Sequence, residues 1–112
     1  MIEINIARDY SKTPGGRYRK DGKFSGEDFR ENFLIPKYLM AKESGEQLII
    51  NLDGGYGYGS SFLEEAFGGL VRELDNVDID ILAFVSNEEP QLLYDIKKYL
   101  EDALTTKKGK KK

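Results

Sequence analysis

The sequence predicts a single α/β domain with a mixed, mostly parallel β-sheet and helices packed on it. Short apolar runs of strand length alternate along the chain with longer stretches whose apolar residues recur every three or four positions. Strands that alternate with helices favour parallel pairing, because each helix returns the chain to the same end of the sheet. A chain of 112 residues is long enough for one domain with its own core.

The first strand is predicted from Ile2, Ile4 and Ile6, which alternate with more polar residues. The residues at 9–25 are polar and contain two turn signals, so they predict a loop, with a short strand around Arg17–Arg19.

The first long helix is predicted from about Gly26 to Lys42. Ser25 stands where a helix cap is expected, and Asp28 follows at the spacing of a capping box. Pro36 lies inside the apolar stripe, so we expect the helix to be kinked or restarted there.

The second half of the chain repeats the strand–helix alternation. Gln47–Leu52 is an apolar run typical of a central strand, and Ile79–Val85 resembles it. Between them, the stretch Ser60–Leu74 has the spacing of an amphipathic helix. After Pro90, which suits a helix start, apolar residues stripe a last helix to Leu104.

The chain carries its charges unevenly. Five of its 17 basic residues lie at 107–112, so residues 1–106 have a net charge of −8. We therefore expect a domain at 1–104 and a disordered, lysine-rich tail at 105–112. An acidic body argues against a broad nucleic-acid surface, although the tail could touch polyanions weakly.

The composition excludes several kinds of chemistry. There is no cysteine and no histidine, which removes thiolate chemistry, the commonest general base and the commonest metal ligand. We expect no cofactor, no metal and no enzymatic activity. No apolar run is long enough for a membrane span and the start lacks a signal-peptide pattern, so a cytoplasmic protein is expected.

The glycine-rich stretch "DGGYGYGSS" lies between the central strand and the following helix. Its Gly54, four residues and Gly59 approach the phosphate-loop pattern, but Ser60 replaces the lysine that reaches the phosphates. The loop still leads into the amino terminus of a helix, and that geometry favours the binding of an anion.

Two stretches, "GRYRKDGKFSGEDFRENFLIPKYL" and "INLDGGYGYGSSFLEEAFGGLVRE", resemble the bacterial and phage STAS-like family of unknown function. The likeness covers roughly Arg17 to Leu104. It implies the fold of anti-sigma factor antagonists, in which a partner kinase phosphorylates a serine at the start of a helix. By that resemblance, Ser60 falls at the phospho-acceptor position and Ser61 lies beside it.

The residues allow competing interpretations of this region. Ser60 or Ser61 could be a helix N-cap, a switch or both. Glu64 and Glu65 would oppose a phosphate nearby. Asp53 could orient its own loop through the backbone N–H groups.

Arg17, Arg19 and Arg30 could face an anion but more often form a solvated surface. The glycine pair Gly68-Gly69 inside a helix suggests a close approach by a neighbouring element or a partner.

The function expected from this evidence is a non-enzymatic regulatory module that binds a partner protein, by resemblance a kinase-type ATPase. The alternative is a small-ligand or nucleotide-binding domain that uses the loop amides. The oligomeric state stays open. The expected contact residues are Asp53, Gly55, Tyr56, Gly57, Tyr58, Gly59, Ser60, Ser61, Glu64 and Glu65.

Overall fold

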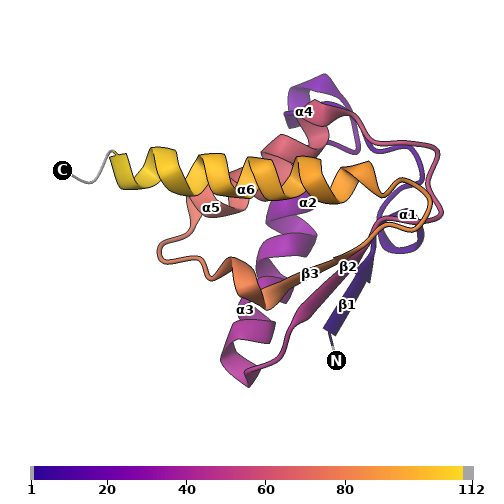
Figure 1. Cartoon of the computed structure of the whole chain (residues 1–112). Coiled ribbons are helices and arrows are strands. Elements are labelled where there is room, and N and C mark those ends of the chain that lie inside the picture. The colour runs from indigo at the N-terminus through magenta and orange to yellow at the C-terminus, as the bar shows by residue number, and fades with distance from the viewer. Residues whose placement is uncertain (1, 110–112) are drawn as a thin grey trace.

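The computed structural model describes residues 2–109 and has an α/β fold (Figure 1). Its sheet has three strands, β1 (Ile2–Asn5), β2 (Leu48–Asn51) and β3 (Leu82–Val85), in the order β1-β2-β3. Both strand pairs are parallel. The α/β class is therefore confirmed, with a sheet that is wholly parallel over the described residues rather than mixed.

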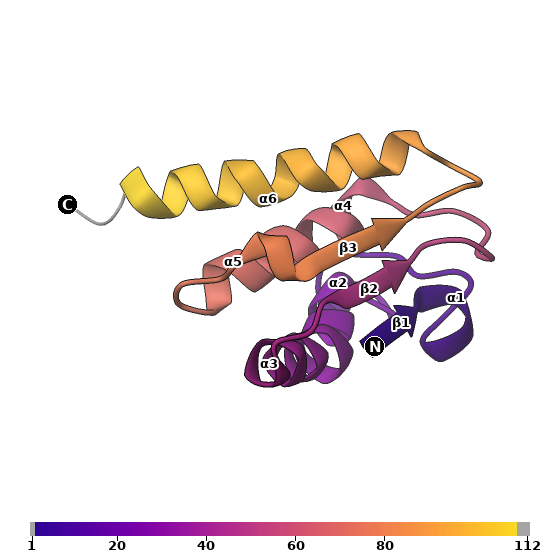
Figure 2. The same cartoon turned by 60° about the horizontal axis from the view of Figure 1, so that its bottom comes forward.

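The helices cover one face of the sheet. Ile4, Ile50 and Phe84 are aligned across the three strands and point toward the helices. On the opposite face, Ile49 lies between Glu3 and Ala83. Figure 2 shows the strands in front of α2, α4 and α5, with no described helix over this second face.

The chain leaves β1 through a short helix, α1 (Ile6–Asp9), so Ile6 is buried at the end of the strand rather than inside it. Asn5 caps this helix through its side chain, which accepts from the N–H of Arg8 at 2.9 Å. The short strand expected around Arg17–Arg19 is wrong. Arg19–Asp21 forms a 3₁₀ turn instead, because the Asp21 side chain accepts from the backbone N–H of Tyr18.

The first long helix runs without a break through α2 (Gly26–Phe29), a π-helical segment (Arg30–Leu34) and α3 (Ile35–Ser44). The predicted cap is confirmed, since the Ser25 hydroxyl accepts from the N–H of Asp28 at 3.0 Å. The expected restart at Pro36 is wrong, because the helix continues through this residue. Proline has no N–H to donate, so it would normally break the helix. The π-helical segment changes the hydrogen-bond pattern just before the proline.

The second helix comprises α4 (Ser60–Leu63), a π-helical segment (Glu64–Gly68) and α5 (Gly69–Glu73). Phe62 and Phe67 are completely buried in it. The prediction that the glycine-rich loop joins a central strand to this helix is therefore confirmed. A 3₁₀ turn, Ile79–Ile81, then leads into β3.

The last helix, α6 (Gln91–Gly109), continues beyond the end expected for it. Residues 105–109, which were expected to belong to a disordered tail, continue this helix, whereas 110–112 lie outside the described residues. Lys107 explains the difference. Its ammonium donates to the carbonyls of Val71, at 2.7 Å, and Leu74, at the carboxyl end of α5. A lysine that satisfies the last carbonyls of a neighbouring helix holds α6 against α5.

Candidate functional site

The glycine-rich loop, residues 53–59, lies at the carboxyl end of β2, the edge where open parallel sheets commonly bind ligands. The Asp53 carboxylate accepts from the N–H groups of Asn87 and Glu88, both at 2.9 Å. In return, the N–H of Gly54 donates to the Glu88 carboxylate at 2.9 Å. Asp53 thus fastens its loop to the loop after β3, rather than bonding its own loop as expected.

The two tyrosines of the loop have different environments. The Tyr58 hydroxyl donates to the carbonyl of Leu52 at 2.9 Å, and its ring lies 6.2 Å from that of Phe62. Burial and the nearby carboxylates, Asp53 first, raise the pKa of Tyr58 to about 12. Tyr56 is 81% exposed, although its backbone N–H is held by the carbonyl of Lys12 at 2.9 Å. The loop therefore presents one aromatic side chain and buries the other.

Glycine is required at two positions of this loop. Gly54 has a φ of 96° and Gly57 a φ of 140°, in the region that other residues rarely adopt. Together with the anchored ends, these conformations give the loop one defined path despite its composition.

Both serines lie exposed in the first turn of α4. The prediction that one of them caps the helix is wrong. Gly59 is the N-cap, with an extended conformation, and its carbonyl accepts from the N–H of Leu63 at 3.2 Å. Because Ser60 is already the first helical residue, both hydroxyls face solvent at a helix amino terminus.

The two glutamates that follow are held by arginines. Glu64 accepts from Arg17 at 2.5 Å and from Arg72 at 2.6 Å. Glu65 is only 8% exposed and accepts from Arg30 at 2.6 Å, while its carbonyl accepts from the same nitrogen at 2.8 Å. Glu65 is therefore a buried structural residue rather than part of an open surface.

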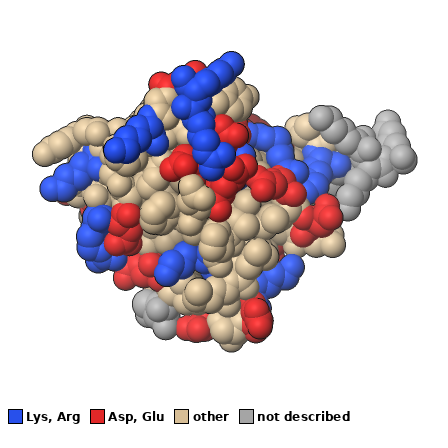
Figure 3. Space-filling model, turned by 180° about the vertical axis from the view of Figure 1, so that it is seen from behind, with Lys and Arg blue, Asp and Glu red and all other residues tan. Residues whose placement is uncertain are grey.

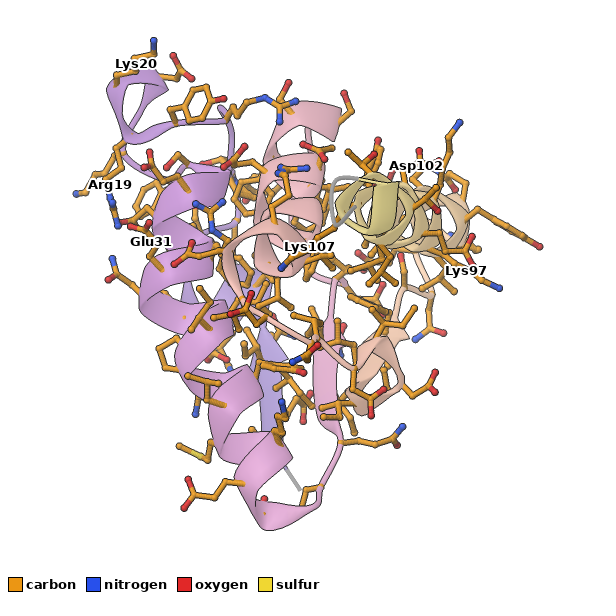
Figure 4. All side chains as sticks on the ribbon, turned by 90° about the vertical axis from the view of Figure 1, so that its left-hand side faces the viewer. Arg19, Lys20, Glu31, Lys97, Asp102 and Lys107 are labelled. Carbon is orange, nitrogen blue, oxygen red and sulfur yellow. The ribbon has the colours of Figure 1, made fainter. Side chains whose placement is uncertain are left out.

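Arg30 differs from the solvated surface that was expected for Arg17, Arg19 and Arg30. Arg30 is 7% exposed and lies between Glu65 and Glu73, 2.9 Å from the Glu73 carboxylate. Arg19 lies on an open surface. It pairs with Glu31 at 2.6 Å (Figure 4).

Two ion pairs lie against the two glycines inside the second helix, the buried Arg30–Glu65 pair at Gly69 and the Glu64–Arg72 pair at Gly68. A Cβ on Gly69 would overlap the guanidinium of Arg30, and a Cβ on Gly68 would lie 2.5 Å from the Glu64 carboxylate. Arg30 and Glu65 each lie in a π-helical segment, and these two segments are in contact. The close approach that Gly68-Gly69 suggests is therefore made by a neighbouring element at Gly69, whereas Gly68 is approached by side chains of its own helix.

The Glu64 carboxylate makes stability depend on pH. Hydrogen bonds from Arg72 and Arg17 hold the pKa of Glu64 below its usual value. A lowered pKa in the folded state stabilises the protein above the ordinary carboxyl pKa, about 4.3, and this contribution disappears as the pH falls through the lowered value. We expect Glu64→Gln to reduce the loss of melting temperature between about pH 6 and pH 3.

Thermal melts of the wild type and Glu64→Gln at a series of pH values provide the measurement. Glu43→Gln, on the exposed side of α3, is the matched control and should melt like the wild type at each pH. Equal acid sensitivity of the wild type and Glu64→Gln would contradict the assignment.

Other sites can be assessed only for the part of the chain that the structure describes. Within 2–109, no group of three or more acidic side chains is arranged to hold a metal ion. Over the same range, no helix has both the length and the apolar character needed to cross a bilayer. Basic and acidic side chains are interspersed on the face in Figure 3.

The comparison with protein families agrees with this arrangement. The model of the STAS-like domain of unknown function (DUF4325) matches residues 25–92, which include the first long helix, β2, the glycine-rich loop and β3. The chain belongs to this family, as its resemblance indicated. No curated protein and no solved structure matches it.

Proposed function

We propose that the protein is a non-enzymatic regulatory module that binds a partner protein through the glycine-rich loop and the first turn of α4. The exposed ring of Tyr56 carries the proposal. A large aromatic side chain at 81% exposure, on a loop fastened at both ends, has the properties of an interface hot spot. Because the loop is ordered beforehand, binding would cost little conformational entropy.

The exposed hydroxyls of Ser60 and Ser61 lie beside this ring in the sequence and provide a means of control. A phosphate there would meet the positive end of the helix dipole, which favours it. It would also lie one turn from Glu64, whose charge the guanidinium groups of Arg17 and Arg72 offset. Phosphorylation of either serine would therefore change the charge of the binding surface without requiring the fold to open.

The alternative, a nucleotide site formed by loop amides, has less support. The N–H of Gly54 is already bound by Glu88, and that of Tyr56 by Lys12. Calorimetry with ATP, GTP and cyclic nucleotides separates the two functions. Saturable binding at micromolar concentration, lost when Gly57 becomes valine, would favour the nucleotide site.

The partner class to test first is a kinase-type ATPase, which the resemblance to the antagonists suggests. The expected result is that Tyr56→Ala weakens capture of the partner while the chain stays folded. Mass spectrometry of the protein from its native host tests the proposed control. Phosphate on Ser60 or Ser61 would support it. The absence of phosphate under every growth condition would mean that the chain resembles the antagonists in fold but not in regulation.

A further inference from the structure

An open groove of about 390 Å³ lies between the outer edge of β3 and α6. Leu82 and Phe84 line it from the strand, and Leu93, Lys97 and Leu100 line it from the helix. The turn before β3 adds Ile79 and the acidic Asp80. Figures 1 and 2 both place α6 beyond β3, on the side of the sheet away from β1. The groove is thus bordered by an edge strand on one side and a helix on the other.

The backbone of β3 faces this groove. β3 pairs with β2 alone, and Leu52 donates its N–H to the carbonyl of Val85 at 2.8 Å. Successive residues of a strand direct their N–H and C=O groups to opposite edges, so those of Phe84 point to the open edge. Within residues 2–109, no backbone group of another element bonds Phe84 there. The edge therefore offers a donor and an acceptor beside an apolar groove.

We propose that this groove binds an extended segment of a partner protein, which adds to the sheet as a fourth strand beside β3. Backbone pairing with Phe84 requires an extended peptide, and apolar side chains at alternate positions would enter the groove. Lys97 adds a charge preference. It makes no ion pair among the described residues, and it points outward from α6 (Figure 4). The segment thus carries a carboxylate next to Lys97 and none next to Asp80, which also lines the groove.

A second copy of the chain fits this edge less well. If two copies paired β3 with β3 about a two-fold axis, both α6 helices would have to lie in the same space next to the paired strands. A single extended segment brings no helix with it. The groove is also separate from the surface around Tyr56, so its occupation does not depend on the function proposed for the loop.

The test uses the full chain and a displayed library of random linear peptides. We expect enriched peptides to share alternating apolar residues and an acidic residue. Their binding should be about tenfold weaker to Leu93→Lys and to Lys97→Glu, a change of about 1.4 kcal/mol. The matched control is Tyr94→Lys, at the neighbouring exposed position of α6, which should bind like the wild type. Methylation of alternate peptide amides should abolish binding, because it removes the backbone hydrogen bonds.

Three results would overturn the proposal. The first is a library that yields no peptide preferring the wild type to Leu93→Lys, with both proteins shown to be folded by thermal melts. The second is a set of enriched peptides that lose binding with Tyr56→Ala instead, which would assign them to the loop surface. The third is a dimer of the free chain that Leu93→Lys dissociates, which would assign the edge to a second copy.

Discussion

Replacing Arg30 with leucine should destabilise the fold by about 3–5 kcal/mol, the cost of removing the closest partner of a buried charge. Arg30 is almost completely buried and binds both the carboxylate and the carbonyl of Glu65. Its loss therefore leaves the buried Glu65 carboxylate with only its longer ion pairs, to Arg17 at 3.3 Å and to Arg72 at 3.6 Å. Denaturant unfolding followed by circular dichroism measures the effect.

Two further variants make this prediction specific. The double variant Arg30→Leu with Glu65→Leu should recover most of the stability, because an apolar pair of similar volume can replace a buried ion pair. Arg19→Leu is the matched control. Arg19 pairs with acidic residues on the surface, where solvent screens the charges, so its loss should change the stability far less than the loss of Arg30. Equal losses for Arg19→Leu and Arg30→Leu would contradict the structural role of the buried pair.

Gly26→Ala should also destabilise the protein, by about 1–3 kcal/mol, although alanine normally favours a helix over glycine. A Cβ at Gly26 would lie 2.6 Å from the carbonyl oxygen of Phe62 and 3.2 Å from the nitrogen of Ala66. Both atoms belong to the backbone of the second helix, so they can yield only if the two helices separate. Thermal unfolding of the variant gives the effect.

The control for this substitution is Gly15→Ala, whose Cβ would meet nothing within 4 Å. Its melting temperature should stay close to that of the wild type. If Gly26→Ala is as stable as the wild type, the close approach of α2 and α4 is wrong.

The pattern of apolar residues predicted the elements better than it predicted the contacts between them. The run ending at Leu52 and the columns of apolar residues after Ser60 predicted a strand, a loop and a helix, and the structure confirms them. The pairing of Arg30 with Glu65 spans 35 residues, and either residue alone is typical of an exposed helix face. The glycine pair Gly68-Gly69 was the sequence signal for this pairing, because glycines inside a helix indicate where a bulky group approaches it.

Local backbone geometry explains the other differences. Ser60 would be the N-cap if the helix began one residue later. Because the backbone of Gly59 is extended, Gly59 is the N-cap and Ser60 is the first helical residue. The length of the last helix depends on Lys107, whose role against α5 appears only after the chain has folded. In the candidate site, the sequence indicated the glycine-rich loop and its two tyrosines but not which ring stays exposed. The Tyr58 hydroxyl bond to Leu52 settles that difference.

The proposed interaction surface is tested most directly by the affinity of the captured partner for three forms of the full chain: wild type, Tyr56→Ala and Met40→Ala. Met40 is an apolar residue of α3 that is 52% exposed, and Figure 1 draws α3 away from the glycine-rich loop. The partner is isolated from the native host on the wild-type chain and titrated against each form. We expect Tyr56→Ala to weaken binding by about 2 kcal/mol or more, roughly thirtyfold, as for a hot-spot residue, and Met40→Ala to leave it unchanged. Equal affinity of all three forms would contradict a binding surface centred on the glycine-rich loop.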